Sequence, residues 1–97
     1  MNFTELKALI YYNRDNDTTL VLITEGDKQA KRLAMMLEVD LFSPFKEIGI
    51  EISFEHPAKR NVILLNNLRI EIAGDIKQVD NIKRTKEHKY YFIEKLN

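Results

Sequence analysis

Glu25, Gly26 and Asp27 stand between an apolar run and a helical pattern, where a binding or catalytic site would first be expected. Free backbone amides at the start of a helix favour an anion. Glu25 and Asp27 already complement that positive end and would repel a phosphate. Neither G-x-x-x-x-G-K-[ST] nor G-x-G-x-x-G occurs in the chain. The sequence therefore argues against a nucleotide site at this turn.

The same turn resembles the first motif of the Toprim domain of topoisomerases and primases, where Glu-Gly joins a strand to a helix. The resemblance rests on Glu25 and Gly26 and implies a Mg²⁺-dependent acid at Glu25. That family also uses an Asp-x-Asp pair on a later strand, and none follows Asp27 here. One carboxylate cannot organise Mg²⁺ for phosphoryl chemistry. We therefore predict a capped turn whose acids satisfy the first helical amides.

Residues 19–37 and 62–74 also look like part of the ATPase core of helicases and phage terminases. The nucleotide-binding loop of that core is missing, so the resemblance implies likeness of fold without activity.

Other residue types that carry catalysis are sparse. His56 and His88 are the two histidines, and neither stands at metal-ligand spacing from another ligand. Ser43 and Ser53 are the two serines, and neither lies in G-x-S-x-G. The sequence predicts no enzyme, no metal site and no cofactor.

The charge is uneven, although the formal net charge is zero. Residues 58–97 are basic, and a segment from 77 to 91 joins cations to aromatic rings. Cations can follow a phosphate backbone and aromatic rings can stack on bases, which makes the segment a candidate contact for nucleic acid or an acidic partner. A solvated surface is the alternative. The candidates are Lys77, Lys83, Arg84, Lys86, Lys89, Tyr90 and Tyr91.

Tyr11 and Tyr12, at the end of the first predicted helix, are candidates for a protein interface, because tyrosine adds contact area at a small entropy cost. Packing against the sheet is the alternative for both rings. The acidic first half and the basic second half would also suit self-association as a homodimer or homo-oligomer.

Three helices and five strands must position these residues. Apolar spacing of three and four residues predicts helices over 2–13 and 27–38, and Asp75 caps a third over 75–85. Pro44 is expected to close the second helical region. Apolar runs and alternation predict strands, and Asn66-Asn67 predicts a two-residue hairpin turn. The strands are 18–24, 47–55, 61–65, 68–73 and 89–95, although 86–95 could instead continue the third helix.

These elements predict an α+β fold, in which one mostly antiparallel sheet of about five strands carries the helices mainly on one face. Residues 1–97 form one domain. The absence of cysteine, of a signal-like N-terminus and of a long apolar run leads us to expect a soluble, cytoplasmic protein without membrane association. We expect a small accessory protein that binds a partner protein. Its Lys/Asn/Ile-rich composition suggests an AT-rich genome, as in phages and mobile elements.

Overall fold

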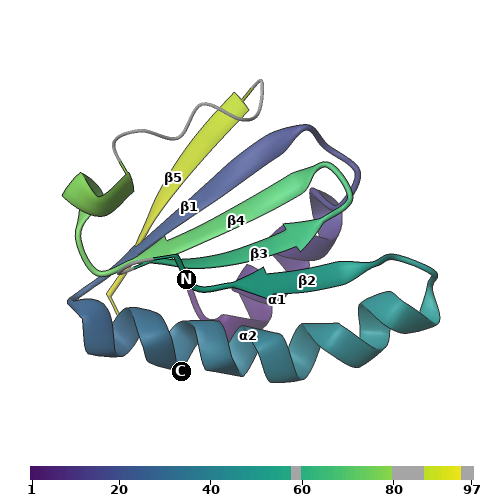
Figure 1. Ribbon diagram of the computed structural model, residues 1–97, viewed down its shortest axis with the longest axis horizontal. Helices are drawn as coiled ribbons and strands as arrows, with labels where there is room; N and C mark the ends of the chain where they lie inside the picture. The colour runs from purple at the N-terminus through teal and green to yellow at the C-terminus, as the bar shows by residue number, and fades with distance from the viewer. Residues whose placement is uncertain (58–59, 80–86, 95–97) are drawn as a thin grey trace.

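The structure is a computed structural model and describes residues 1–57, 60–79 and 87–94. One five-stranded sheet carries two helices, α1 and α2, on one face, and a short 3₁₀ turn, η1, lies on the other face (Figure 1). The predicted α+β class with a single sheet is confirmed.

Helix α1 spans Phe3–Tyr12, inside the predicted range. Asn2 caps it, because Asn2 Oδ1 accepts from the Glu5 amide at 2.8 Å and Glu5 Oε1 accepts from the Asn2 amide at 3.2 Å. This reciprocal pair satisfies two amides that the helix leaves unpaired. Leu6 and Ile10 are buried and attach α1 to the core.

Helix α2 spans Asp27–Glu47, nine residues beyond the predicted end at Glu38. Pro44 lies inside it, so the expected break at Ser43-Pro44 is wrong. A proline costs an interior helix about 3 kcal/mol. Leu41 and Phe45, one turn apart, are both buried in the core, and each buried side chain of this size contributes about 1.5–3 kcal/mol. Their burial offsets the cost of the proline.

Strands β2, β3 and β4 form an antiparallel meander over Ile52–Glu55, Asn61–Leu65 and Leu68–Ala73. The hairpin turn was predicted correctly: Asn66 has a φ of 51°, and Leu65 pairs with Leu68. Strand β2 is shorter than the predicted 47–55, because residues 47–51 end helix α2 and connect it to the strand.

Strand β1 (Thr18–Thr24) lies between β4 and β5 (Glu87–Ile93) and is parallel to both, in the sheet order β2-β3-β4-β1-β5. The sheet is therefore mixed and not mostly antiparallel. All seven residues of β1 are buried, which is typical of a strand with parallel neighbours and covered faces. The expected strand at 89–95 is confirmed in place but begins at Glu87 and ends at Ile93.

The predicted third helix is much shorter than 75–85. The 3₁₀ turn η1 covers Ile76–Val79, and residues 80–85 lie outside the described residues. Asp75 Oδ1 accepts from the Lys77 amide at 3.0 Å, so Asp75 does hold the start of this turn. Val79 packs with Val21, Ile23 and Ala73 on the sheet face that α1 and α2 leave uncovered.

The same sheet face buries an ion cluster. Glu71 is fully buried on β4, and its Oε1 lies 2.9 Å from Arg69 Nη2. Arg60 Nη1 lies 3.3 Å from Glu71 Oε2. Arg69 can pair with Glu71 because side chains two residues apart on a strand point to the same face.

Candidate protein-binding surface

The side of α2 that faces away from the sheet carries a regular row of six side chains, which we call the outer seam. Its members follow one another in alternating steps of four and three residues, and all six are exposed. They are Lys28, Arg32, Met35, Val39, Phe42 and Lys46. The mean step of 3.6 residues equals the number of residues in one helical turn, so the six side chains form one line along the helix axis.

The centre of the outer seam is apolar. Met35 is 57% exposed, Val39 is 77% exposed and Phe42 is 44% exposed. These three side chains cover about 10 Å along the helix axis. Single exposed apolar residues are normal on a protein surface, but a contiguous group marks a candidate interaction site.

Cations occupy both ends of the outer seam. Lys28 and Arg32 precede the apolar centre, and Lys46 follows it with Nζ 5.5 Å from the centroid of the Phe42 ring. Within the described residues, none of these three cations makes an ion pair. Their charge is therefore available to a partner.

Two acids that flank the apolar centre of the seam, Glu38 and Asp40, already have partners of their own. Asp40 Oδ2 accepts from Lys7 Nζ of α1 at 3.0 Å. Glu38 Oε1 lies 3.3 Å from His56 Nε2, in the loop that follows β2. The two carboxylates turn to the flanks of α2 and leave the seam with a positive charge.

The apolar centre continues into a groove of about 580 Å³ between the C-terminal half of α2 and the edge of the sheet. Phe42 and Lys46 belong to both the seam and the groove, and Ile50, Ile52 and Leu64 add apolar lining. A groove of this kind can accept a large anchoring side chain from a partner.

A second, more polar hollow of about 550 Å³ surrounds His56 near the N-terminal half of α2. His56 Nδ1 lies 2.8 Å from Asn61 Oδ1, while its Nε2 faces Glu38. Each ring nitrogen of His56 therefore lies close to a side-chain oxygen that can accept a hydrogen bond. Met35 lines this hollow too. The contacts tie the β2–β3 loop to α2 and so support the helix that carries the seam.

No protein-family model, curated protein or solved structure matches the chain. Among the described residues, no three His, Asp or Glu side chains are grouped so that they could hold a metal ion. In the same part of the chain, every helix is too short or too polar to cross a membrane.

The turn at Glu25-Gly26-Asp27 joins β1 to α2, as the sequence predicts. Gly26 is the N-cap residue with a φ of 95°, and no side chain caps the helix, so the expected capping by acids is wrong. Asp27 Oδ1 instead accepts from Gln78 Nε2 at 3.0 Å. The φ of Gly26 accounts for the glycine in this turn, and the close approach of the turn accounts for Gly74, because a Cβ at Gly74 would lie 2.2 Å from the Gly26 carbonyl carbon.

The two candidate interface tyrosines lie at the end of α1 and away from the outer seam in sequence. Tyr12 is 79% exposed and Tyr11 is half exposed. The Tyr11 ring lies 6.0 Å from the Phe45 ring, and the Arg14 guanidinium stacks above it at 4.2 Å. Tyr11 therefore packs partly against α2, whereas Tyr12 keeps most of its area free for a partner.

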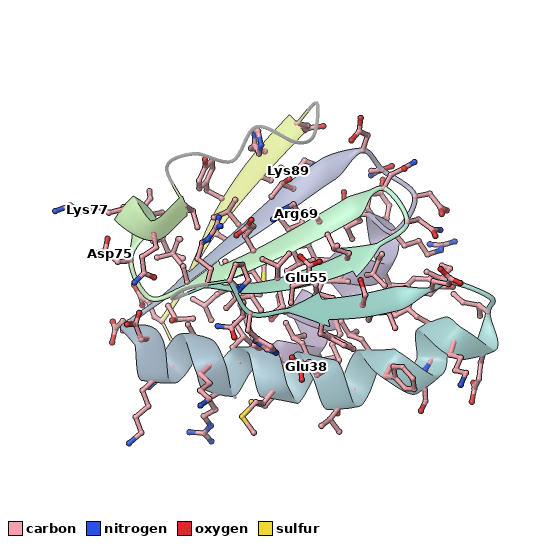
Figure 2. The ribbon with its side chains drawn as sticks, viewed as in Figure 1. Glu38, Glu55, Arg69, Asp75, Lys77 and Lys89 are labelled. Carbon is pink, nitrogen blue, oxygen red and sulfur yellow. The ribbon has the colours of Figure 1, made fainter. Side chains whose placement is uncertain are left out.

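The basic segment is divided between elements and faces. Lys77 points outward from η1, and Lys89 lies on β5 (Figure 2), 3.7 Å from Glu87. Tyr90 is exposed on one face of β5, while Tyr91 is half-buried against the main core on the other. Three further candidates, Lys83, Arg84 and Lys86, lie outside the described residues. Tyr90 therefore shares its sheet face with η1, whereas Tyr91 lies on the opposite face, and the role of the segment as a contact stays a prediction.

Sequence reasoning overlooked the outer seam, although its pattern can be read directly. Steps of four and three from residue 28 to residue 46 indicate a second helical stripe beside the core-facing one. The predicted helix end at Glu38 placed Val39, Phe42 and Lys46 outside the helix. Met35 was then left without apolar neighbours on its side of the helix.

Proposed function

We propose that the chain is a small non-enzymatic accessory protein, which binds a partner protein through the outer seam. The exposed apolar centre at Met35, Val39 and Phe42 is the observation that carries this proposal. These three side chains are not part of the hydrophobic core. Covering side chains of this size removes apolar area from water, and full burial of each one contributes about 1.5–3 kcal/mol.

The layout of the seam supports a protein partner. Protein interfaces combine an apolar centre with a polar rim, and their anchors fill well-packed pockets. The apolar centre of the seam lies between Arg32 and Lys46, and the groove beside Phe42 supplies the pocket. Cytoplasmic location, and an origin in a phage or mobile element, belong to the same proposal and rest on the amino-acid sequence alone.

Affinity capture from a lysate of the native host tests the proposal with matched variants. Val39→Glu places a charge in the apolar centre, and Tyr12→Glu places the same charge at an equally exposed site on α1. A docking partner should remain bound to the wild type and to Tyr12→Glu, and should be lost from Val39→Glu. An identical set of proteins on wild type and Val39→Glu would show that the seam is not the docking surface.

A further inference from the structure

The two edges of the sheet differ in how well they are protected against pairing with another strand. Strands β2 and β5 form these edges, and an edge strand presents unpaired backbone amides and carbonyls. Strand β2 is four residues long, and the exposed Glu51 precedes it while the exposed Glu55 ends it. Short strands and charged side chains are devices by which proteins block an edge. Strand β2 is therefore a poor template for a further strand.

Strand β5 lacks this protection. It is seven residues long, and it contains no proline. Its second half is aromatic and apolar, and Tyr90 is 48% exposed while Phe92 is 66% exposed. In its first half, Glu87 Oε1 lies 3.7 Å from Lys89 Nζ, so these two charges compensate each other. Among the described residues, no strand pairs with the outer side of β5.

The two exposed rings of β5 lie on one face of the sheet. Tyr90 pairs with Val21 of β1, and Phe92 pairs with Ile23. Both β1 residues belong to the apolar cluster that packs against η1, so the rings extend this cluster to the edge of the sheet. We infer that a second copy of this chain covers the rings, with its β5 antiparallel to the first across a twofold axis perpendicular to the sheet.

The residue pattern of β5 is self-complementary in this arrangement. A register centred on Tyr90 pairs all seven residues of one strand with all seven of the other. Tyr90 then lies opposite Tyr90 of the second copy, and Phe92 lies opposite His88. The perpendicular axis keeps the η1 faces of both copies on the same side, so the exposed rings meet. Aromatic side chains that lie opposite each other stabilise an antiparallel pair.

A second copy fits this edge better than an unrelated peptide strand. An added strand must bring apolar side chains to both faces, beside Tyr90 and Phe92 on one and beside Tyr91 and Ile93 on the other. Strand β5 itself has this pattern on both faces. The twofold pair also consumes both β5 edges, so assembly stops at a dimer whose remaining edges are the protected β2 strands.

The dimer leaves the outer seam accessible. Strand β5 lies at the opposite edge of the sheet from β2 (Figure 1), and the groove beside Phe42 is lined by residues of β2. Pairing at β5 therefore does not compete with a partner protein on α2, and the inference is independent of the proposed function.

Disulfide trapping tests the inference, because the chain has no cysteine. In the proposed register the Cβ atoms at position 90 of the two copies are about 5 Å apart, near the separation in a disulfide. Tyr90→Cys should therefore form a disulfide-linked dimer under mild oxidation. Phe92→Cys is the matched control, because its site is more exposed but the two copies of it are offset by about 13 Å along the strands. Random collisions would crosslink Phe92→Cys at least as fast.

Sedimentation equilibrium measures the dimer without a crosslink. The wild type should dimerise, and Tyr90→Lys should raise the dissociation constant at least about 10-fold, because it places like charges opposite each other. Tyr12→Lys, at an exposed site on α1, should leave the constant unchanged. Both variants replace exposed side chains, so they should fold, and circular dichroism checks this.

Three results overturn the inference. They are a monomeric wild type, a dimer that Tyr90→Lys does not weaken, and disulfide formation as fast at position 92 as at position 90. None of them bears on the outer seam, which Val39→Glu tests separately.

Discussion

Arg69 Nη2 and Glu71 Oε1 lie 2.9 Å apart on one strand, and the Glu71 side chain has no solvent exposure. Removing the negative charge leaves Arg69 buried and unpaired, so Glu71→Gln should lower the free energy of unfolding by about 3 kcal/mol. The double variant Arg69→Met, Glu71→Leu should lose less, because no charge remains buried and Arg60 can turn to water. Urea denaturation measures both. An equal loss in both variants would contradict the ion-pair explanation.

Gly74 should tolerate no side chain. A Cβ there would lie 2.2 Å from the Gly26 carbonyl carbon and 2.4 Å from the Asp27 amide nitrogen. Because both neighbours are backbone, Gly74→Ala should cost about 3 kcal/mol. Gly49 is the control, since its φ is +79° but the space around it is open, and Gly49→Ala should cost about 1 kcal/mol. Thermal unfolding measures the loss of stability in both variants. A smaller loss for Gly74→Ala than for Gly49→Ala would contradict the predicted clash.

Replacing Pro44 should stabilise the protein. Pro44 has no amide hydrogen to donate to Asp40 one turn earlier in α2. Pro44→Ala restores that bond and should raise the free energy of unfolding by about 2 kcal/mol, after the greater entropy of the unfolded chain is counted. Ser43→Ala, at the adjacent exposed position, should change it by less than about 0.5 kcal/mol. Chemical denaturation measures both variants. A lower free energy of unfolding for Pro44→Ala than for the wild type would mean that the proline stabilises α2.

Phe42 should be the strongest single contact of the outer seam, because it also lines the groove at the end of α2. Phe42→Ala should weaken binding of the captured partner by about 2 kcal/mol, roughly 30-fold. Tyr12→Ala removes a similarly large exposed ring and should leave affinity unchanged. Isothermal titration of both variants separates the two sites, and equal losses would count against the seam.

Much of the fold can be predicted from local patterns. The bounds of β1 and β4 agree with prediction to the residue, because β-branched apolar runs end abruptly at turn residues there. The capping box of α1 and the Asn66 turn are also local signals. The parallel placement of β1 between β4 and β5 is not local. Pairing between strands that are distant in the sequence depends on which surfaces pack together. The sequence of one strand does not show which strand it will pair with.

The candidate site was missed for a related reason. Pro44 is a strong local signal for a helix end, and the burial of Leu41 and Phe45 against the sheet overrides it. If α2 lacked its last nine residues, Val39 and Phe42 would lie outside the helix, and the sequence would not place them in one row with Met35. The exposed Tyr12 could be proposed from sequence because residue type alone suggested it.

NMR mapping of the interface tests the central claim most directly. The ¹⁵N-labelled chain is titrated with the partner captured by the wild type, and amide shift changes are followed along the sequence. We predict that the largest changes run from Lys28 to Lys46 and into the groove residues Ile50 and Ile52, while Tyr12 and Tyr90 are little affected. Changes centred on β5 or on the end of α1, with α2 unaffected, would contradict the account.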